Sequence, residues 1–126
     1  MELKNEFQSI RDWAEQRNLY IKGDTKTQFV KLLEEVGELS RAILTKNPKE
    51  LKDAIGDIVV VLTNLTELAN NDIFSKEEYE DIAGDGGPSL LIITEGEVTI
   101  EDCINSAFNE IRNRKGKMEN GTFKKD

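Results

Sequence analysis

The chain has 126 residues, of which 33% are charged and 37% hydrophobic, and its formal net charge is −8. This length predicts a single domain over residues 1–126 with a modest core. Because phosphate backbones and anionic membranes attract basic surfaces, the acidity argues against a nucleic-acid polymer or a membrane as partner. The negative net charge is still compatible with a small anionic ligand if the acids hold metal ions, which reverse the local sign of the charge.

The sequence contains no histidine and one cysteine, Cys103. Without histidine, Ser-His and Cys-His catalysis and histidine zinc sites are excluded. An enzyme with this sequence has to work with carboxylates, lysines, arginines, amides and water. One cysteine allows no internal disulfide, and its place on the apolar side of an expected helix predicts an inert core residue. No signal segment or membrane span is recognised, so the expected location is cytoplasmic.

Apolar residues at helical spacing predict four main helices, so the expected fold class is all-α, a helical bundle. Asn47-Pro48 ends one helix and starts the next, because proline suits a first helical turn. Asp24 or Thr25 is the expected cap of the second helix, and Thr99 opens the fourth. The expected ranges are residues 3–18, 25–46, 48–70 and 99–114.

The third helix contains the run IVVVLTNL, residues 58–65, which is apolar nearly all round. A β-strand is the alternative there, since valine and isoleucine favour strands. The helical pattern continues from Leu51 to Ala69, so we expect a helix. An apolar circumference indicates a central helix that is buried on more than one side.

Residues 71–98 are longer than a bundle connection needs, so we interpret them as an insertion between the third and fourth helices. SKEEYEDI, residues 75–82, predicts a short helix, and Leu90–Thr94 is a candidate strand; a surface loop is the alternative. The basic tail, residues 115–126, carries turn signals at Gly116 and Asn120-Gly121.

The second helix carries a strip of acids beside its apolar stripe. At 100° per residue, Glu35 and Glu38 fall on one side with Gln28 and Lys31, and Glu34 is four residues before Glu38. Like charges at this spacing repel, and a divalent cation with oxygen ligands would offset the repulsion. The alternative is a solvated acidic face.

The third helix carries Asp53 and Asp57 at the entrance to its most apolar stretch. A carboxylate beside a valine-rich face has to be paired or metal-bound. Gly37 and Gly56 each lie beside an acid, and either close helix approach or simple small-residue packing explains them. Two antiparallel helices would bring four or five carboxylates around one volume, which suits one to three Mg²⁺ ions bridging the phosphates of a nucleotide.

The segments LLEEVGELSRAI and LKDAIGDIVVVLTNLTEL resemble the MazG-like all-α nucleotide pyrophosphohydrolases, whose signature is E-x-x-E followed by E-x-x-D. The ending AFNEIRNRKGKMENGTFKKD resembles short proteins of this family from phages and Gram-positive bacteria. Glu35 and Glu38 match the first motif and Asp57 matches the last acid. The chain departs at Ala54, where the pattern has Glu. Asp53, or a literal Glu50-x-x-Asp53, is the alternative.

The resemblance implies Mg²⁺, with Mn²⁺ as a substitute, on Glu35, Glu38 and Asp57. Glu34 or Asp53 is then a further ligand or a water-orienting base. The implied reaction converts (deoxy)nucleoside triphosphates to the monophosphate and pyrophosphate, in nucleotide-pool house-cleaning. The implied assembly is a homo-oligomer, dimer or tetramer.

Substrate-binding candidates lie outside the acidic motifs. Asn109, Arg112 and Lys115 are candidates for phosphate and sugar, although cations at a helix end also suit the helix dipole. Lys31 and Gln28 are candidates beside the acids, and Trp13 is a candidate for stacking on a base or a core residue. A catalytically impaired MazG-like protein, acting as a helical interaction or nucleotide-sensing module, is the alternative function.

Overall fold

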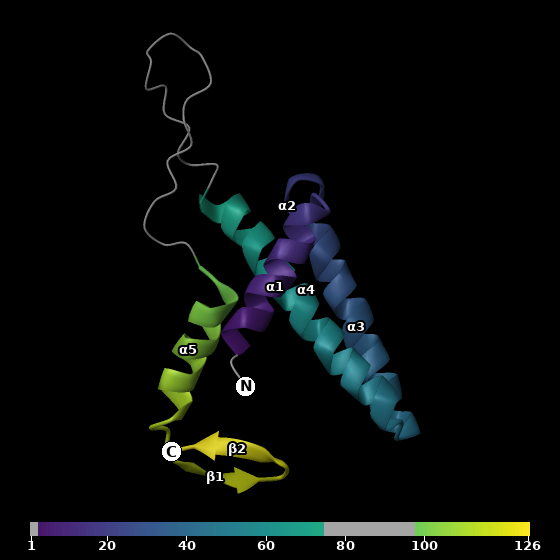
Figure 1. Cartoon of the computed structure of the whole chain (residues 1–126). Coiled ribbons are helices and arrows are strands. Elements are labelled where there is room, and N and C mark those ends of the chain that lie inside the picture. The colour runs from purple at the N-terminus through teal and green to yellow at the C-terminus, as the bar shows by residue number, and fades with distance from the viewer. Residues whose placement is uncertain (1–2, 75–97) are drawn as a thin grey trace.

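The computed structural model describes residues 3–74 and 98–126 (Figure 1). The described residues are mostly helical and include one small two-stranded sheet, which confirms the all-α class. Its elements are α1 (Leu3–Gln16), α2 (Leu19–Lys22), α3 (Thr25–Thr45), α4 (Pro48–Phe74), α5 (Ile100–Ile111), β1 (Gly116–Glu119) and β2 (Thr122–Lys125). The expected short helix at 75–82 and strand at Leu90–Thr94 lie outside the described residues.

The helix ends follow the capping signals. The Asp24 carboxylate accepts a hydrogen bond of 2.8 Å from the backbone N–H of Thr27 at the start of α3, and this bond lowers the pKa of Asp24. The side chain of Asn47 accepts bonds from the first N–H groups of α4, at Lys49 and Glu50. The Asn-Pro turn is therefore confirmed, and it sets α3 and α4 side by side (Figure 1).

Helix α4 is the central element, because α1, α2, α3 and α5 all pack against it. The strand alternative for residues 58–65 is wrong. Among its buried polar side chains, Thr63 donates to the carbonyl of Val59, and Asn64 accepts a 2.7 Å bond from the Tyr20 hydroxyl of α2. Burial of Tyr20 raises its pKa to about 12, so this hydroxyl stays protonated and donates.

Helix α4 is four residues longer than expected and ends at Phe74. Two side chains support its last turns: Asp72 accepts a hydrogen bond from the Thr25 hydroxyl, and Asn70 accepts one of 2.8 Å from the backbone N–H of Val98. The expected connection before α3 is itself partly helical, as α2. Both extensions depend on contacts between segments distant in sequence.

The basic tail forms a β-hairpin that the sequence interpretation missed. β1 and β2 pair antiparallel, with Met118 opposite Phe123. Asn120 and Gly121 both have positive φ, at 51° and 81°, as a two-residue hairpin turn of type I′ requires. The Asn-Gly signal was present, but the flanking strands are only four residues long. The hairpin packs against none of the described helices.

Helices α3 and α4 bury only a narrow strip between them. The small residues Ala42 and Ala54 are buried, whereas Phe29, Val36 and Ile43, which are apolar residues at helical spacing on α3, stay exposed. Cys103 is also exposed, so its assignment to the core is wrong. A pair of helices covers one side of each helix, and the rest of an apolar stripe stays uncovered in a single chain.

Gly37 and Gly56 do not serve close helix approach. A methyl group added at either position would meet no atom within 4 Å among the described residues. The small residues that are buried on these two helices are instead Ala42 and Ala54.

One ion pair ties α5 to α1. The guanidinium of Arg11 donates two hydrogen bonds, of 2.7 and 2.6 Å, to the carboxylate of Glu101, and both side chains are largely buried. The Glu101 carboxylate raises the pKa of Arg11, so the guanidinium keeps its charge. This contact is the strongest described link between the N-terminal helices and α5.

We expect Arg11→Gln to lower the free energy of unfolding by about 1.5–3 kcal/mol, because it leaves a half-buried carboxylate without its charged donor. Urea denaturation followed by circular dichroism measures the change. Lys117→Gln breaks the exposed pair of Lys117 with Glu119 and serves as control, with a loss of about 0.5 kcal/mol or less. Equal losses in the two variants would contradict this prediction.

Candidate metal centre

Three carboxylates from α3 and α4 meet at one point. Glu35 and Glu38 come from α3 and Asp57 from α4, and one oxygen of each lies within 4.8 Å of the others. Glu35 and Glu38 are one turn apart, so both project toward α4. Of the four or five carboxylates that the sequence predicted around one volume, these three converge in the fold.

Glu35 is the unusual member of this cluster, because it is only 5% exposed. Its Oε1 pairs with the ammonium of Lys31 at 3.2 Å, whereas its Oε2 is buried and has no hydrogen-bond partner among the described residues. The hydrogen bond and the charge of Glu35 raise the pKa of Lys31. A buried carboxylate oxygen without a partner is costly, and a cation coordinated there would remove the cost.

Glu34 lies at the edge of the cluster rather than in it. Its side chain is 62% exposed, and its carboxylate is 3.7 Å from the ammonium of Lys31. Lys31 thus stands between Glu34 and Glu35, and a ligand that displaced Lys31 would gain access to both carboxylates.

The charge of Glu35 raises the pKa of Glu38 above its ordinary 4.5. The metal-free folded chain then binds this proton more tightly than the unfolded chain does. The contribution of Glu38 to the free energy of unfolding should therefore fall as the pH rises from 4.5 through the raised pKa. The side chain in Glu38→Gln cannot titrate. In EDTA, the melting temperature of the variant minus that of the wild type should therefore increase as the pH rises from about 4 to about 7. A difference in melting temperature that stays constant across that range would contradict the repulsion between the Glu35 and Glu38 carboxylates.

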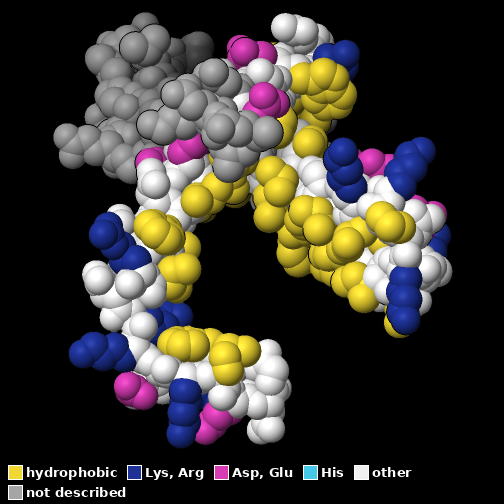
Figure 2. Space-filling model, turned by 60° about the horizontal axis from the view of Figure 1, so that its bottom comes forward, with side chains coloured by type: hydrophobic (Ala, Val, Ile, Leu, Met, Phe, Trp, Pro, Cys, Tyr) yellow, Lys and Arg dark blue, Asp and Glu magenta, His cyan; other side chains and the backbone are white. Residues whose placement is uncertain are grey.

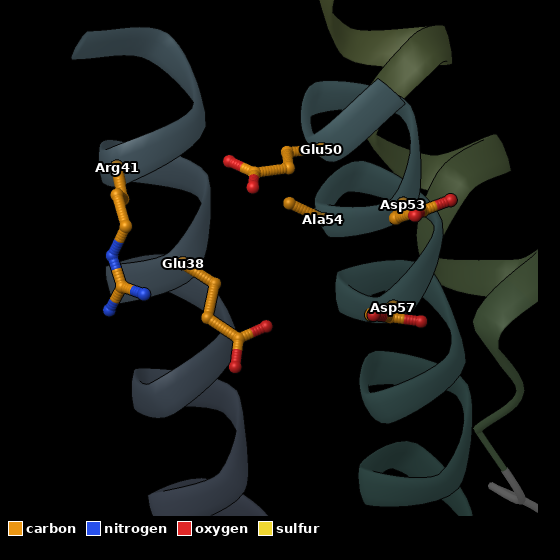
Figure 3. Close-up of a pocket in the computed structure, with 6 residues that line it drawn as sticks. All are labelled: Glu38, Arg41, Glu50, Asp53, Ala54 and Asp57. Atoms are coloured by element: carbon orange, nitrogen blue, oxygen red, sulfur yellow. The ribbon is translucent and has the colours of Figure 1, made fainter. Parts of the chain in front are cut away.

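A hollow of about 290 Å³ opens beside the cluster, between α3 and α4. Figure 3 shows its lining, in which the Glu50 side chain points across toward α3 and the Asp53 side chain points away from it. Ala54 faces α3 about one turn after Glu50, with only a methyl group. The lining residues are Glu38, Arg41, Glu50, Asp53, Ala54 and Asp57.

A second hollow, of about 460 Å³, lies between α1 and α4 and shares Asp57 with the first. Its apolar wall includes Ile10, Trp13 and Val60. Trp13 is 47% exposed, and the guanidinium carbon of Arg17 lies 4.4 Å from its ring centroid. This tryptophan is therefore not a core residue, and it borders a hollow that opens onto an acid of the cluster.

The other substrate-binding candidates lie elsewhere. Asn109 is on α5, and Arg112 and Lys115 follow between α5 and β1, where the Arg112 guanidinium lies over the Phe108 ring. None of these, nor the half-buried Gln28, lines either hollow. Sequence reasoning missed Arg41, although its position three residues after Glu38 places it on the same side of α3.

Comparison with known proteins agrees with this geometry. Residues 24–80 match the family model of the MazG nucleotide pyrophosphohydrolase domain. The chain is 39% identical, over 66 residues, to an uncharacterized 18.2 kDa protein in the rep-hol intergenic region of Haemophilus phage HP1. That match covers 52% of this chain and 40% of the relative, so the chain spans less than half of the relative's length. No solved structure matches the chain.

Among the described residues, no helix combines the length and the apolar character needed to cross a membrane. The segment that matches the family contains α3, the Asn-Pro turn and α4, and with them all three acids of the cluster. Over residues 24–80 the chain is therefore similar to the MazG nucleotide pyrophosphohydrolase domain.

Proposed function

We propose that this chain hydrolyses (deoxy)nucleoside triphosphates to the monophosphate and pyrophosphate, with Mg²⁺, as a cytoplasmic house-cleaning enzyme of the nucleotide pool. The observation that supports this proposal most directly is the buried Glu35 carboxylate beside Glu38 and Asp57. One of its oxygens has no hydrogen-bond partner among the described residues. A solvated acidic face would not bury a carboxylate in this way.

The donor set fits Mg²⁺, and Mn²⁺ as its substitute, because all the ligands are carboxylate oxygens. Glu35, Glu38 and Asp57 would hold the ion. When bound, Mg²⁺ neutralises phosphate charge and makes water a better nucleophile. Mg²⁺ usually keeps positions for water and substrate phosphates beside one or two carboxylates, and the hollow beside the cluster has room for both.

The chain's own residues have two further tasks in this proposal. Glu34 or Asp53, both of which are exposed, is proposed to orient the attacking water by accepting its proton. Lys31 releases Glu35 and turns to the phosphates, which its flexible stem and its half-exposed position allow. Phosphoryl transfer depends on such positioning and charge neutralisation more than on covalent catalysis.

The nucleobase is proposed to lie in the hollow beside Trp13. Because this hollow shares Asp57 with the metal centre, one nucleotide could reach both. We expect Trp13→Ala to raise KM about 10-fold or more with little change in kcat, since base stacking on an aromatic ring is worth roughly 1–3 kcal/mol. Trp13→Phe should keep most of the affinity. Steady-state kinetics measures both, and an unchanged KM in Trp13→Ala would place the base elsewhere.

A homo-oligomer, dimer or tetramer, is part of the proposal. Asn109, Arg112 and Lys115 line neither hollow of their own chain, so phosphate binding by them calls for a second copy. Exposed apolar side chains gather on two limbs of the molecule, over α3 and α4 and along α5 with the hairpin (Figure 2). Such surfaces are typical of protein contacts.

A second function is supported by Ala54. Where the family pattern has Glu, this residue offers the hollow only a methyl group, which favours an impaired MazG-like protein that binds nucleotide or a partner without turnover. Pyrophosphate release across a panel of nucleoside triphosphates with Mg²⁺ decides between the two. Release that requires Mg²⁺ supports hydrolysis, whereas nucleotide binding without release supports the sensor.

A further inference from the structure

Lys31 makes the one ion pair that is found for Glu35 among the described residues. The pair involves only Oε1, at 3.2 Å from the ammonium, and it leaves the buried Oε2 without a partner in the described part of the chain. A carboxylate that is 5% exposed needs partners for both of its oxygens. Lys31 is therefore an incomplete partner for Glu35.

The Lys31 side chain is free to move without losing its pairing. It is 50% exposed and has a flexible four-carbon stem. The exposed carboxylate of Glu34 lies 3.7 Å from the same ammonium. The hydrogen bond with Glu35 and the charges of Glu35, Glu34 and Glu38 raise the pKa of Lys31, so the side chain that these acids share is a cation. A small movement would transfer it from Glu35 to Glu34.

We infer that Lys31 is the counter-ion of Glu35 in the metal-free protein, and that a divalent cation binding the three-acid cluster displaces it toward Glu34. This inference rests on the proposed function and goes beyond it, because it assigns the release of Glu35 to the metal ion and not to the phosphates. Lys31 then has two opposite effects: it stabilises the fold without metal and it lowers the affinity for metal.

Electrostatics link the departure of Lys31 to the entry of the ion. Mg²⁺ lies about 2.1 Å from a carboxylate oxygen, so on Oε1 it would be within roughly 5 Å of an ammonium that kept its 3.2 Å contact. Positive charges this close repel each other, and more so in a partly buried site. If Lys31 left without an ion in its place, both oxygens of Glu35 would be buried and unpartnered.

The rival explanation is that Lys31 stays on Oε1 and orients Glu35, while the ion takes only Oε2. Groups that orient a metal ligand in this way support metal binding, and their loss costs 10- to 100-fold in metal affinity. The two explanations predict changes of opposite sign. Removal of Lys31 strengthens metal binding if the ion displaces it, and weakens metal binding if Lys31 orients Glu35.

The experiment measures the affinity of the full-length chain for Mn²⁺, without nucleotide, from the electron paramagnetic resonance signal of unbound Mn²⁺. We expect Lys31→Met to bind about 10-fold more tightly than the wild type, as it would if about a tenth of the wild-type chains have Glu35 released. Lys31→Arg keeps a cation beside Glu35 and should bind no more tightly than the wild type.

Lys26→Met is the matched control for the loss of a lysine charge. Lys26 is exposed on the same helix, nine residues before Glu35, which at 100° per residue is the opposite side of α3. Its Mn²⁺ affinity should equal that of the wild type. An equal gain in Lys26→Met and Lys31→Met would show a general effect of charge and would overturn the displacement.

Stability gives a readout that does not depend on the affinity. In EDTA, Lys31→Met should melt at a lower temperature than the wild type, because Glu35 loses its charged partner. With saturating Mn²⁺ this deficit should shrink, since the ion then occupies the place of Lys31. Circular dichroism follows the melting. A deficit of the same size with and without Mn²⁺ would contradict the exchange.

Glu34→Gln tests where Lys31 goes. It removes the carboxylate that would receive the displaced ammonium, so it should weaken Mn²⁺ binding when Lys31 is present and much less in the Lys31→Met background. An equal loss in the two backgrounds would contradict the movement toward Glu34. Glu110→Gln removes the same charge from the exposed face of α5 and should leave the affinity unchanged.

The failure of this inference and the failure of the proposed function are distinguishable. A Lys31→Met variant that binds Mn²⁺ no more tightly than the wild type would overturn the displacement and leave the metal centre intact. A wild type that binds no Mn²⁺ would instead refute the metal centre, and with it the proposed function.

Discussion

Glu38→Gln should reduce pyrophosphate release at least about 100-fold at millimolar Mg²⁺. Changes to groups that merely support a metal ligand cost 10- to 100-fold, and Glu38 is a proposed ligand itself. Its carboxylate, like that of Asp57, belongs to both the three-acid cluster and the hollow of about 290 Å³. The amide keeps the size of the side chain and removes the charge that binds the cation.

The fold should survive this change. Glu38 is exposed, and repulsion from Glu35 raises its pKa, so the metal-free protein loses an unfavourable interaction when the charge is removed. The wild-type melting temperature should rise with Mg²⁺, because a ligand that binds the native state stabilises it, and the variant should show little of this rise. Glu110→Gln is the matched control and should behave as the wild type. Full activity in Glu38→Gln would refute the metal assignment.

The second large effect concerns assembly. We expect the wild type to be at least a dimer at micromolar concentration, held through the apolar face of α3 and α4. The side chains of this face are 36% to 59% exposed in the single chain: Phe29, Leu33, Val36, Ile43, Leu51, Ile55 and Val59. On each helix they lie on the side away from the acids, so association would leave the hollow open.

Ile55→Lys should raise the dissociation constant at least about 100-fold, since interface hot spots contribute 2 kcal/mol or more. In a two-fold symmetric contact each substitution acts twice, once in each copy. Ile21→Lys places the same change on the exposed surface of α2 and should leave the mass unchanged. Light scattering at several concentrations measures the mass, and circular dichroism checks the helices. A monomeric wild type, or an Ile55→Lys variant with the wild-type mass, would contradict the prediction.

The helices and their limits were largely encoded in local sequence. Asp24 and Thr99 cap the helices they were expected to cap, and Asn47-Pro48 separates α3 from α4. Helical periodicity also fixed which acids share a side of one helix, as for Glu35 and Glu38. These features depend on hydrogen bonds and angles within a few residues, so composition and spacing are enough to predict them.

Tertiary structure decided how the helices face each other. A helical wheel gives angles within one helix but not the rotation of one helix against another. Only the fold therefore distinguishes Glu50, which points toward α3, from Asp53, which points away. The same rotation buried one oxygen of Glu35 without a partner and left Ile55 exposed. Such outcomes depend on which faces meet when α3 and α4 pack, and that choice is made by contacts between residues distant in sequence.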